Sequence, residues 1–234
     1  MSDKKEPNIN SQHRSRQKKK FLENGLDGFQ QHEILEAMLF YSIPQADTKP
    51  IAKALLKEFG TLKGVFEADV SDLQKVKGVG EHTASMIHFF RLLSAEYIKM
   101  TCSQGAQMNN SKEVLRYAKA DFLGIDHEQV RILCLDQKLK LLKDVLINDG
   151  GIGQVEINAR KIAESAFQAK CDRIILLHNH PKSNCMPSRG DIAATRTIAS
   201  SLSVIGIGII DHIIVGMDGE YSMRESDILT DVLK

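Results

Sequence analysis

Residues 171–191 read CDRIILLHNHPKSNCMPSRGD, a pattern that predicts a buried strand, a turn and the start of a helix. The uninterrupted apolar run at 174–177 is typical of a strand that is covered on both faces of its sheet. His178 and His180 follow this run. Because side chains alternate along a strand, the two imidazoles are expected on one face, with Cα atoms about 6–7 Å apart. The end of this strand is therefore a candidate ligand site.

Asp191 provides a third candidate ligand. The segment 187–190 opens a helix, which places the Asp191 carboxylate in the first turn, facing back toward the end of the strand. Two imidazoles and one carboxylate form the three-ligand set that hydrolytic zinc uses while its fourth position is kept for water. A structural zinc would need four ligands, and no C-x2-C spacing occurs among the four cysteines (Cys102, Cys134, Cys171 and Cys185). An open site for one Zn2+ per chain is therefore predicted.

The same positions carry a resemblance to known proteins. His178, His180, Ser188 and Asp191 reproduce an H-x-H-x7-S-x2-D signature, in which the chain resembles the JAB/MPN (JAMM) metalloproteases. Within that superfamily, the HNHP form of the motif, the following strand GIGIIDHIIVG (206–216) and the helical N-terminal half resemble the bacterial RadC family. The resemblance covers nearly all of the chain after its basic N-terminal segment.

The resemblance implies both a fold and an activity. The fold is expected to be mixed α/β, with an N-terminal all-α, helix-hairpin-helix-like domain and then a JAB/MPN-type mixed sheet flanked by helices. The implied activity is that of a zinc metallopeptidase or amidohydrolase, acting on an amide or isopeptide carbonyl of a peptide or protein substrate. The RadC name also implies DNA repair or replication, so a DNA-associated accessory protein with a non-catalytic metal site is the alternative function.

Glu128 is the candidate general base. In the family this role belongs to a Glu at the start of an early strand, and HEQVRILCLD (127–136) provides the match. By alternation Glu128 shares a face with Val130, at the edge of an apolar stripe. Glu156 and Glu113 are the alternatives, although they are expected in a loop that enters a helix and in the first turn of a helix.

Ser188 and Asp191 allow two interpretations. In the implied mechanism, Glu128 takes a proton from the attacking water and returns it to the leaving amine, while Ser188 stabilises the oxyanion. Alternatively, Ser-x-x-Asp before an apolar residue is a capping-box pattern, in which both residues serve only the start of the helix. The two upstream histidines favour metal ligation, and one carboxylate can serve both purposes.

Asp211 and His212 lie in the next predicted strand, 206–216. A buried carboxylate and a paired core histidine are the simpler interpretation of these two residues. Support of the metal ligands is the alternative. Neither side chain is expected to bind the metal directly.

The composition is ordinary for a globular chain. Its 234 residues are 42% hydrophobic and 26% charged, with a net charge of +1, which allows one or two domains. No apolar run approaches the roughly 18 residues of a membrane span, and the polar N-terminus lacks a signal-peptide core. A cytoplasmic protein without membrane contact is expected, and the scattered cysteines suit a reducing compartment.

Residues 1–20 form a basic segment, in which seven Lys or Arg residues stand against two acidic residues. Because the segment has no apolar periodicity, a disordered, solvated tail is predicted. Sequence-independent attraction to phosphate is the alternative. The rest of the chain carries a small negative net charge.

A helical domain is predicted at 21–99. Its most informative part, LQKVKGVGEHTASMIHFFRLL (73–93), resembles the helix-hairpin-helix motif, whose glycines let the hairpin backbone approach a DNA phosphate. Such binding would be independent of base sequence and sensitive to salt. A compact turn in a protein-interaction domain is the alternative, and the acidic Glu81 supports it. The candidate phosphate contacts are Gly78, Gly80, Lys75 and Lys77.

A linker at 100–110 is predicted to precede the JAB/MPN domain at 111–234, because helical periodicity is lost there. Beyond the linker, alternating patterns predict helices and short strands in a mixed order. The expected elements are a helix at 111–122, a hairpin of strands at 130–135 and 141–147, a helix at 158–170, the ligand strand and its helix, and strands at 207–215 and 221–222.

Overall fold

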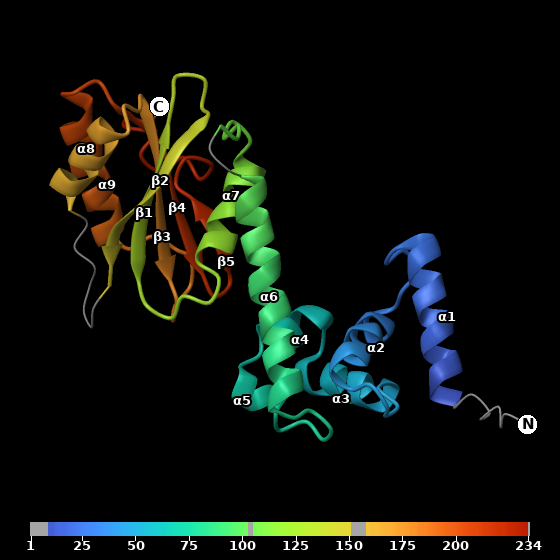
Figure 1. Cartoon of the computed structure of the whole chain (residues 1–234). Coiled ribbons are helices and arrows are strands. Elements are labelled where there is room, and N and C mark those ends of the chain that lie inside the picture. Colours follow the sequence, from blue (N-terminus) through green and yellow to red (C-terminus); the bar gives the residue numbers. More distant parts are fainter. Residues whose placement is uncertain (1–8, 103–104, 151–157, 234) are drawn as a thin grey trace, which may run out of the picture. The chain divides into compact units, whose positions relative to one another are not determined.

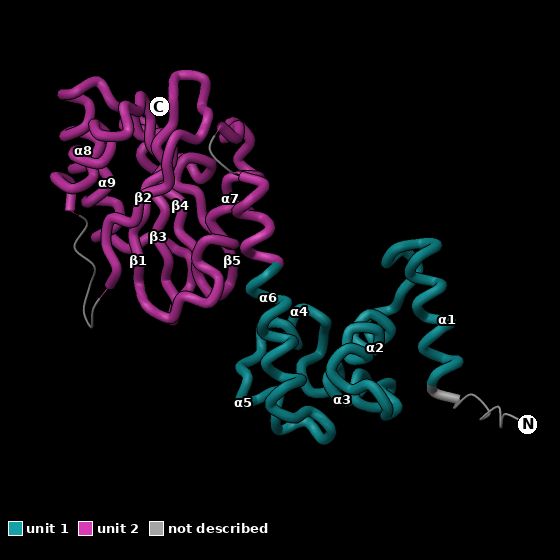
Figure 2. The backbone as a smooth tube through the Cα atoms, viewed as in Figure 1, with its two compact units in different colours: residues 1–93 teal, residues 94–234 magenta. Residues whose placement is uncertain are grey.

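The computed structural model describes residues 9–102, 105–150 and 158–233, and the chain divides into two compact units, Met1–Leu93 and Ser94–Lys234 (Figure 1, Figure 2). In unit 1 the described residues form helices joined by loops, whereas unit 2 contains a sheet. Each unit has a hydrophobic core of its own. None of the helices in the described ranges combines the length and the hydrophobicity that a membrane span requires.

Amphipathic helices build the core of unit 1. The sequence periodicity predicts helices at the positions of α2, α3 and α4, and all three form. Their buried faces contribute Leu35, Leu39 and Leu55 to one cluster. Gly60 ends α3 with a φ of +78°, a conformation that glycine adopts without steric cost. The helices are α1 (Ile9–Asn24), α2 (Gln31–Ser42), α3 (Lys49–Phe59), α4 (Leu62–Glu67), α5 (Val70–Leu73) and α6 (Glu81–Thr101).

The prediction of a disordered tail at residues 1–20 is wrong for residues 9–20, which form most of α1; residues 1–8 lie outside the described residues. Polar contacts dock this helix. His13 Nε2 lies 2.7 Å from Oε1 of the buried Glu36, and the Arg14 guanidinium donates to the Ile43 and Ala46 carbonyls at 2.6 Å each. Because α1 is held by polar contacts, its sequence shows no apolar periodicity, and the helix could not be predicted from that pattern.

Glu33 links α1 to the start of α2. Its carboxylate accepts hydrogen bonds from the Gln30 amide at 3.0 Å and from Lys20 Nζ at 3.1 Å. The Gln30 bond, helped by Lys20, lowers the pKa of Glu33 from 4.5 to about 2. Because the folded pKa lies below the unfolded one, this stabilisation is complete above pH 4.5 and is lost as the pH falls toward 2.

We expect Glu33→Ala to lower the free energy of unfolding by about 1 kcal/mol at pH 7, the usual effect of losing a helix cap. At pH 2 the loss should be much smaller. Denaturant unfolding at the two pH values measures both quantities, with Glu23→Ala as the control because Glu23 makes only a 3.8 Å surface pair with Lys19. An equal loss of unfolding free energy at both pH values would contradict a lowered pKa of Glu33 in the folded protein.

Unit 2 is built on a five-stranded mixed sheet with the order β2-β1-β3-β4-β5. β1 pairs antiparallel with β2 and with β3, β3 pairs parallel with β4, and β5 returns antiparallel to β4. The predicted mixed α/β class and the predicted hairpin are confirmed. The strands are β1 (Gln129–Leu135), β2 (Leu141–Asp149), β3 (Arg173–His180), β4 (Gly208–Gly216) and β5 (Gly219–Ser222).

Helices cover both faces of this sheet: α7 (Ser111–Asp121) lies on one face, and α8 (Ala159–Gln168) and α9 (Arg189–Ser203) lie on the other (Figure 1). In β3, Ile174 and Leu176 belong to the core under α8 and α9, whereas Ile175 and Leu177 belong to the core under α7. Burial on both faces accounts for the uninterrupted apolar run. The next even-numbered side chains, the two histidines of the motif, therefore face α9.

The prediction of a linker at 100–110 does not hold for the residues that the structure describes there. Helix α6 continues to Thr101, the Gly105 amide donates to the Leu141 carbonyl at 2.7 Å, and Met108 is buried. Backbone hydrogen bonds to the β2 edge hold this segment, so its side chains carry no periodic signal. The segment belongs to unit 2.

Candidate metal centre

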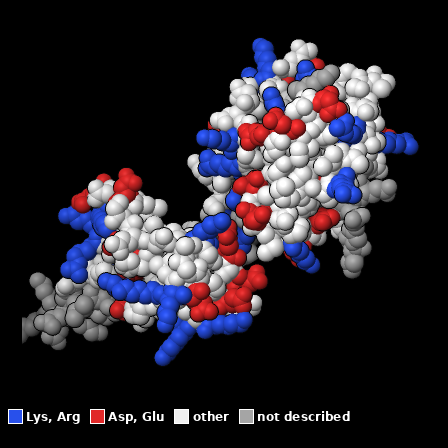
Figure 3. Space-filling model, turned by 180° about the vertical axis from the view of Figure 1, so that it is seen from behind, with Lys and Arg blue, Asp and Glu red and all other residues white. Residues whose placement is uncertain are grey.

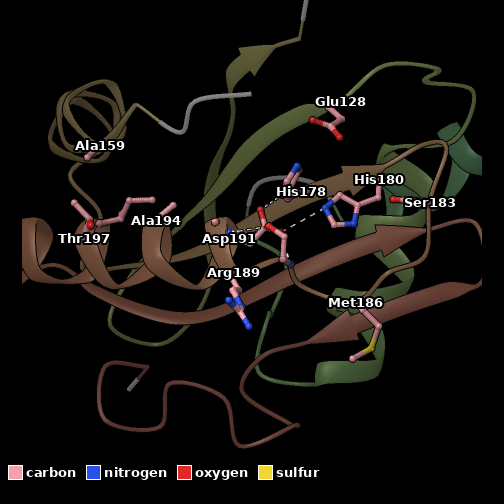
Figure 4. Close-up of a pocket in the computed structure, with 13 residues that line it drawn as sticks. Glu128, Ala159, His178, His180, Ser183, Met186, Arg189, Asp191, Ala194 and Thr197 are labelled. Atoms are coloured by element: carbon pink, nitrogen blue, oxygen red, sulfur yellow. Dashed lines mark hydrogen bonds and ion pairs between the residues drawn. The ribbon is translucent and has the colours of Figure 1, made fainter. Parts of the chain in front are cut away.

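The end of β3 and the first turn of α9 bring the three predicted ligands together (Figure 4). One donor atom from each of His178, His180 and Asp191 lies within 4.8 Å of the others, and all three residues are buried. His178 Nδ1 lies 3.3 Å from Asp191 Oδ1, and His180 Nε2 lies 3.6 Å from Asp191 Oδ2. Strand alternation and the helix register therefore produce the convergence that the sequence predicts.

The unpaired nitrogens of His178 support a metal at this position. Neither ring nitrogen makes a hydrogen bond, although both are buried, because the 3.3 Å approach to Asp191 lacks hydrogen-bond geometry. Buried polar atoms in folded proteins are nearly always paired, and an unpaired one requires an explanation such as a missing ion. His180 differs, because its Nδ1 lies 2.9 Å from the Asn184 carbonyl. That bond leaves His180 Nε2 free to bind a metal.

Asp191 is held in its ionised form. Burial by itself would raise the pKa of this carboxyl, but the contacts with His178, His180 and Ser188 outweigh burial and hold the pKa far below its ordinary value. The pKa of His180 is raised by the same carboxylate. A buried negative charge beside two imidazoles is an environment suited to a divalent cation.

The capping box predicted from Ser188 and Asp191 is present. The Ser188 amide and hydroxyl donate to Asp191 Oδ2 at 2.7 and 2.6 Å, and the Asp191 amide donates to Ser188 Oγ at 3.1 Å. Asp191 Oδ1 stays directed toward His178. Capping and metal ligation are therefore compatible in one carboxylate, whereas Ser188 would have to redirect its hydroxyl to stabilise an oxyanion.

Glu128 shares a cavity with the three candidate ligands. It immediately precedes β1, is half-buried, and lies across the cavity from Asp191 (Figure 4). Of the two alternatives, Glu113 is exposed in the first turn of α7, on the other side of the sheet, and Glu156 lies outside the described residues. The cavity has a volume of about 970 Å3, and its other lining residues include Ala159, Ser183, Met186, Ser188, Arg189, Gly190, Ala194, Thr197 and Ile198.

His212 and Asp211 lie on opposite faces of β4. The fully buried His212 ring stacks on His178, with ring centroids 6.1 Å apart. The Thr195 hydroxyl donates to the backbone carbonyl of Asp191 at 2.6 Å, and His212 Nδ1 lies 2.7 Å from the same Oγ1, where the neutral ring can donate its N–H. Burial lowers the pKa of His212 to about 3, so the ring is neutral at pH 7.

Asp211 takes no part in this arrangement. Its carboxylate accepts hydrogen bonds from Ser222 Oγ at 2.6 Å and from the Arg224 amide at 3.0 Å. Burial raises its pKa. The sequence allows the same two interpretations for Asp211 and His212, whereas in the structure only His212 contacts the candidate ligands.

The loop between β3 and α9 depends on a glycine that sequence reasoning missed. A Cβ at Gly216 would lie 2.3 Å from the Cys185 amide nitrogen, so the loop packs directly against this backbone. The Cys185 amide also donates to Asp218 Oδ1 at 2.8 Å. This packing positions the Asn184 carbonyl that holds His180. A glycine at the end of a strand is a usable sequence signal for such close approach, but it does not identify the partner.

Comparison with known families agrees with this geometry. A family model described as a RadC-like JAB domain matches residues 108–228, and one described as a SAM-like helix-hairpin-helix tandem matches residues 49–90. The chain belongs to the RadC family. The match to the RadC-like JAB domain contains the sheet, its covering helices, the three candidate ligands and Glu128. The predicted family and fold class are thus confirmed.

The predicted hairpin of this RadC family member lies between α5 and α6. Gly78 has a φ of +93°, a conformation that favours glycine, and a Cβ there would lie 2.9 Å from the end of the Ile51 side chain. Gly80 differs, because a Cβ at this position would meet no atom within 4 Å. Val76 and Val79 anchor the hairpin in the core of unit 1.

The two lysines of the hairpin are both exposed. Lys75 Nζ lies 2.6 Å from Asp72 Oδ1, and Lys77 follows on the same turn. Basic side chains gather on the face of unit 1 seen in Figure 3, but acidic ones are interspersed. Glu81, at the start of α6, is among the nearby acidic residues.

Proposed function

We propose that this RadC family member is a metal-dependent hydrolase of amide bonds. The observation that carries the proposal is the set of three buried donors, in which neither ring nitrogen of His178 makes a hydrogen bond, in a cavity that also contains Glu128. Among the residues that the structure describes, the donors number three rather than four, which suits a catalytic site better than a structural one. A peptide or protein is the proposed substrate, with an amide or isopeptide bond as the group cleaved.

Zinc is the proposed metal, because two imidazoles and a carboxylate form a tetrahedral set with one position left over. Zinc in such a site supplies Lewis-acid polarisation of a carbonyl and lowers the pKa of water toward about 7. His178, His180 and Asp191 would hold it. The Asn184 carbonyl, by accepting from His180 Nδ1, fixes which nitrogen of that ring faces the site.

The remaining chemistry falls to side chains of the cavity. Glu128 would accept a proton from the attacking water at its carboxylate and then donate this proton to the leaving amine nitrogen. Ser188 would donate its hydroxyl to the developing oxyanion after releasing Asp191 Oδ2. The neutral His212 ring, stacked on His178, adds no charge to the site at pH 7.

The decisive test measures both the zinc content and the peptide cleavage of the same purified protein. The purified full chain should contain about one zinc per chain after reconstitution, and it should cleave members of a fluorogenic peptide library. A chelator should abolish cleavage, and added zinc should restore it. A chain that binds no metal, or that cleaves equally well with chelator present, would overturn the proposal.

A second function is proposed for unit 1, namely sequence-independent binding of DNA phosphates through the hairpin. The helix-hairpin-helix match, the exposed Gly80 and the adjacent start of α6 support it, since a helix N-terminus and open backbone suit a phosphate. If only this function exists, the metal site would be non-catalytic and the protein would be a DNA-associated accessory factor. The family name points to DNA repair or replication as the setting for it.

Salt dependence checks the DNA proposal. With a duplex of arbitrary sequence, the double variant Lys75→Ala, Lys77→Ala should reduce the slope of log K against log salt concentration by about 2, because two phosphate contacts are lost. The full chain should be used, with Lys112→Ala, Lys138→Ala in unit 2 as the matched control. An unchanged slope, or no binding by the wild type at low salt, would exclude the hairpin as the DNA site.

A further inference from the structure

The side chain of Asn179 holds the backbone on both sides of Glu128. Asn179 lies between the two histidines of the motif and is 2% exposed. Its Oδ1 accepts a hydrogen bond from the Gln129 amide at 2.6 Å, and its Nδ2 donates to the His127 carbonyl at 2.9 Å. The two partners are the residues immediately before and after Glu128. His180, the next residue of β3, bonds instead to the Asn184 carbonyl of its own loop.

These two bonds take over where strand pairing stops. The β1–β3 register runs from Leu135 opposite Arg173 to Val130 opposite His178, and it ends there. One residue further along β3, the carboxamide of Asn179 offers one acceptor and one donor, as a peptide group does. It therefore replaces the missing peptide of the ladder and fixes the chain at 127–129.

A second set of contacts holds the same segment from the β2 side. The side chains of His127 and Gln129 both reach Asp149 Oδ1, at 2.7 and 2.6 Å, and the Gly150 amide donates to the Glu128 carbonyl at 2.9 Å. The backbone of Glu128 is thus fixed on two sides, while its side chain stays in the cavity. Because Asn179 is buried and points away from the histidine face, it has no route to a substrate.

We propose that Asn179 is a positioning residue, which sets the location of the Glu128 carboxylate relative to the metal ligands. This inference rests on the proposed hydrolytic function. It gives the middle residue of the His-Asn-His motif a role of its own. The flanking histidines bind the metal, and Asn179 of the same strand positions the Glu128 base. An aspartate could accept from Gln129 but not donate to His127 when ionised, and a serine hydroxyl is too short to span both groups.

Hydrogen exchange tests the clamp without any metal. In the metal-free full chain, Asn179→Ala should accelerate exchange of the Gln129 amide at least 10-fold, and Asn179→Asp, which keeps the shape and the acceptor, should accelerate it less. Ser222→Ala removes another buried polar group of the same sheet and should leave this amide unchanged. Unchanged Gln129 exchange in Asn179→Ala would overturn the inference.

Cobalt tests the consequence for Glu128. Cobalt-loaded wild type should show a pH-dependent visible spectrum whose midpoint is shifted by Glu128→Gln. Asn179→Ala and Asn179→Asp should shift the midpoint in the same direction while the cobalt Kd changes less than threefold, whereas Ser222→Ala should shift neither quantity. A shift in Glu128→Gln with none in the Asn179 variants would overturn the positioning role alone. No shift in Glu128→Gln would overturn the proposed base, and the positioning role with it.

Discussion

Glu128→Gln is expected to leave zinc bound and to lower kcat by roughly 10²- to 10⁴-fold, the usual contribution of a general base. The amide keeps the size and the backbone contacts of Glu128 but cannot accept a proton at neutral pH. The carboxylate shares the cavity of the ligands without belonging to the three-donor group, so its loss should not release the metal. Zinc content by elemental analysis and peptide-library turnover measure the two effects separately.

The matched control for this change is Glu113→Gln. Glu113 is an exposed glutamate of the same unit, in the first turn of α7 and away from the cavity. Its variant should retain both zinc and turnover. A Glu128→Gln protein with full turnover would remove the base from the proposed mechanism, and loss of turnover only in the Glu113 variant would reassign the role.

His178→Ala should weaken zinc binding by about 100-fold or more, because changes that merely disturb a ligand's supporting contacts already cost roughly 10- to 100-fold. Both ring nitrogens of His178 are buried and make no hydrogen bond, so the change deletes a ligand and, in the metal-free protein, only the 3.3 Å contact with Asp191 Oδ1. The variant should therefore fold, and its fault should appear only when metal is added.

Unfolding with and without zinc measures this prediction within each protein. At a free zinc concentration of 100 Kd, a ligand that binds only the folded state adds about 2.7 kcal/mol to the free energy of unfolding. At that same concentration, His178→Ala should gain less than about 0.5 kcal/mol, since its Kd would equal or exceed the zinc present. His82→Ala, a change at an exposed histidine of α6, should keep the full gain. Equal gains in all three proteins would place zinc elsewhere.

Much of the centre is readable from the chain because its spacing is local. His178 and His180 are two residues apart in a strand whose apolar run identifies it, and Asp191 lies one turn into a helix with a capping signature. Strand alternation and helix geometry then fix the direction of each side chain without knowledge of the rest of the fold. Glu128 is less local: the family pattern, together with its place at the edge of an apolar stripe, selected it among three glutamates.

Sequence periodicity failed where polar contacts or backbone bonds organise the chain. Helix α1 docks through His13 and Arg14, and residues near Met108 are held by the β2 edge, whereas the sequence pattern predicted a disordered tail and a linker there. Neither produces a repeating apolar signal, because the partners are single buried groups or carbonyls that are distant in the sequence. Such contacts are specified only by the three-dimensional neighbours.

The sequence by itself determined the ligand strand, the capped helix that follows it, the RadC family and the identity of the three candidate metal ligands, since each depends on residues a few positions apart. Only the tertiary structure decided that His212 stacks on His178 while Asp211 bonds to Ser222, and that Asn179 contacts the residues on both sides of Glu128, 50 and 52 residues away in the sequence. A side chain's face follows from local backbone geometry, whereas its partner depends on which strands the whole fold brings together.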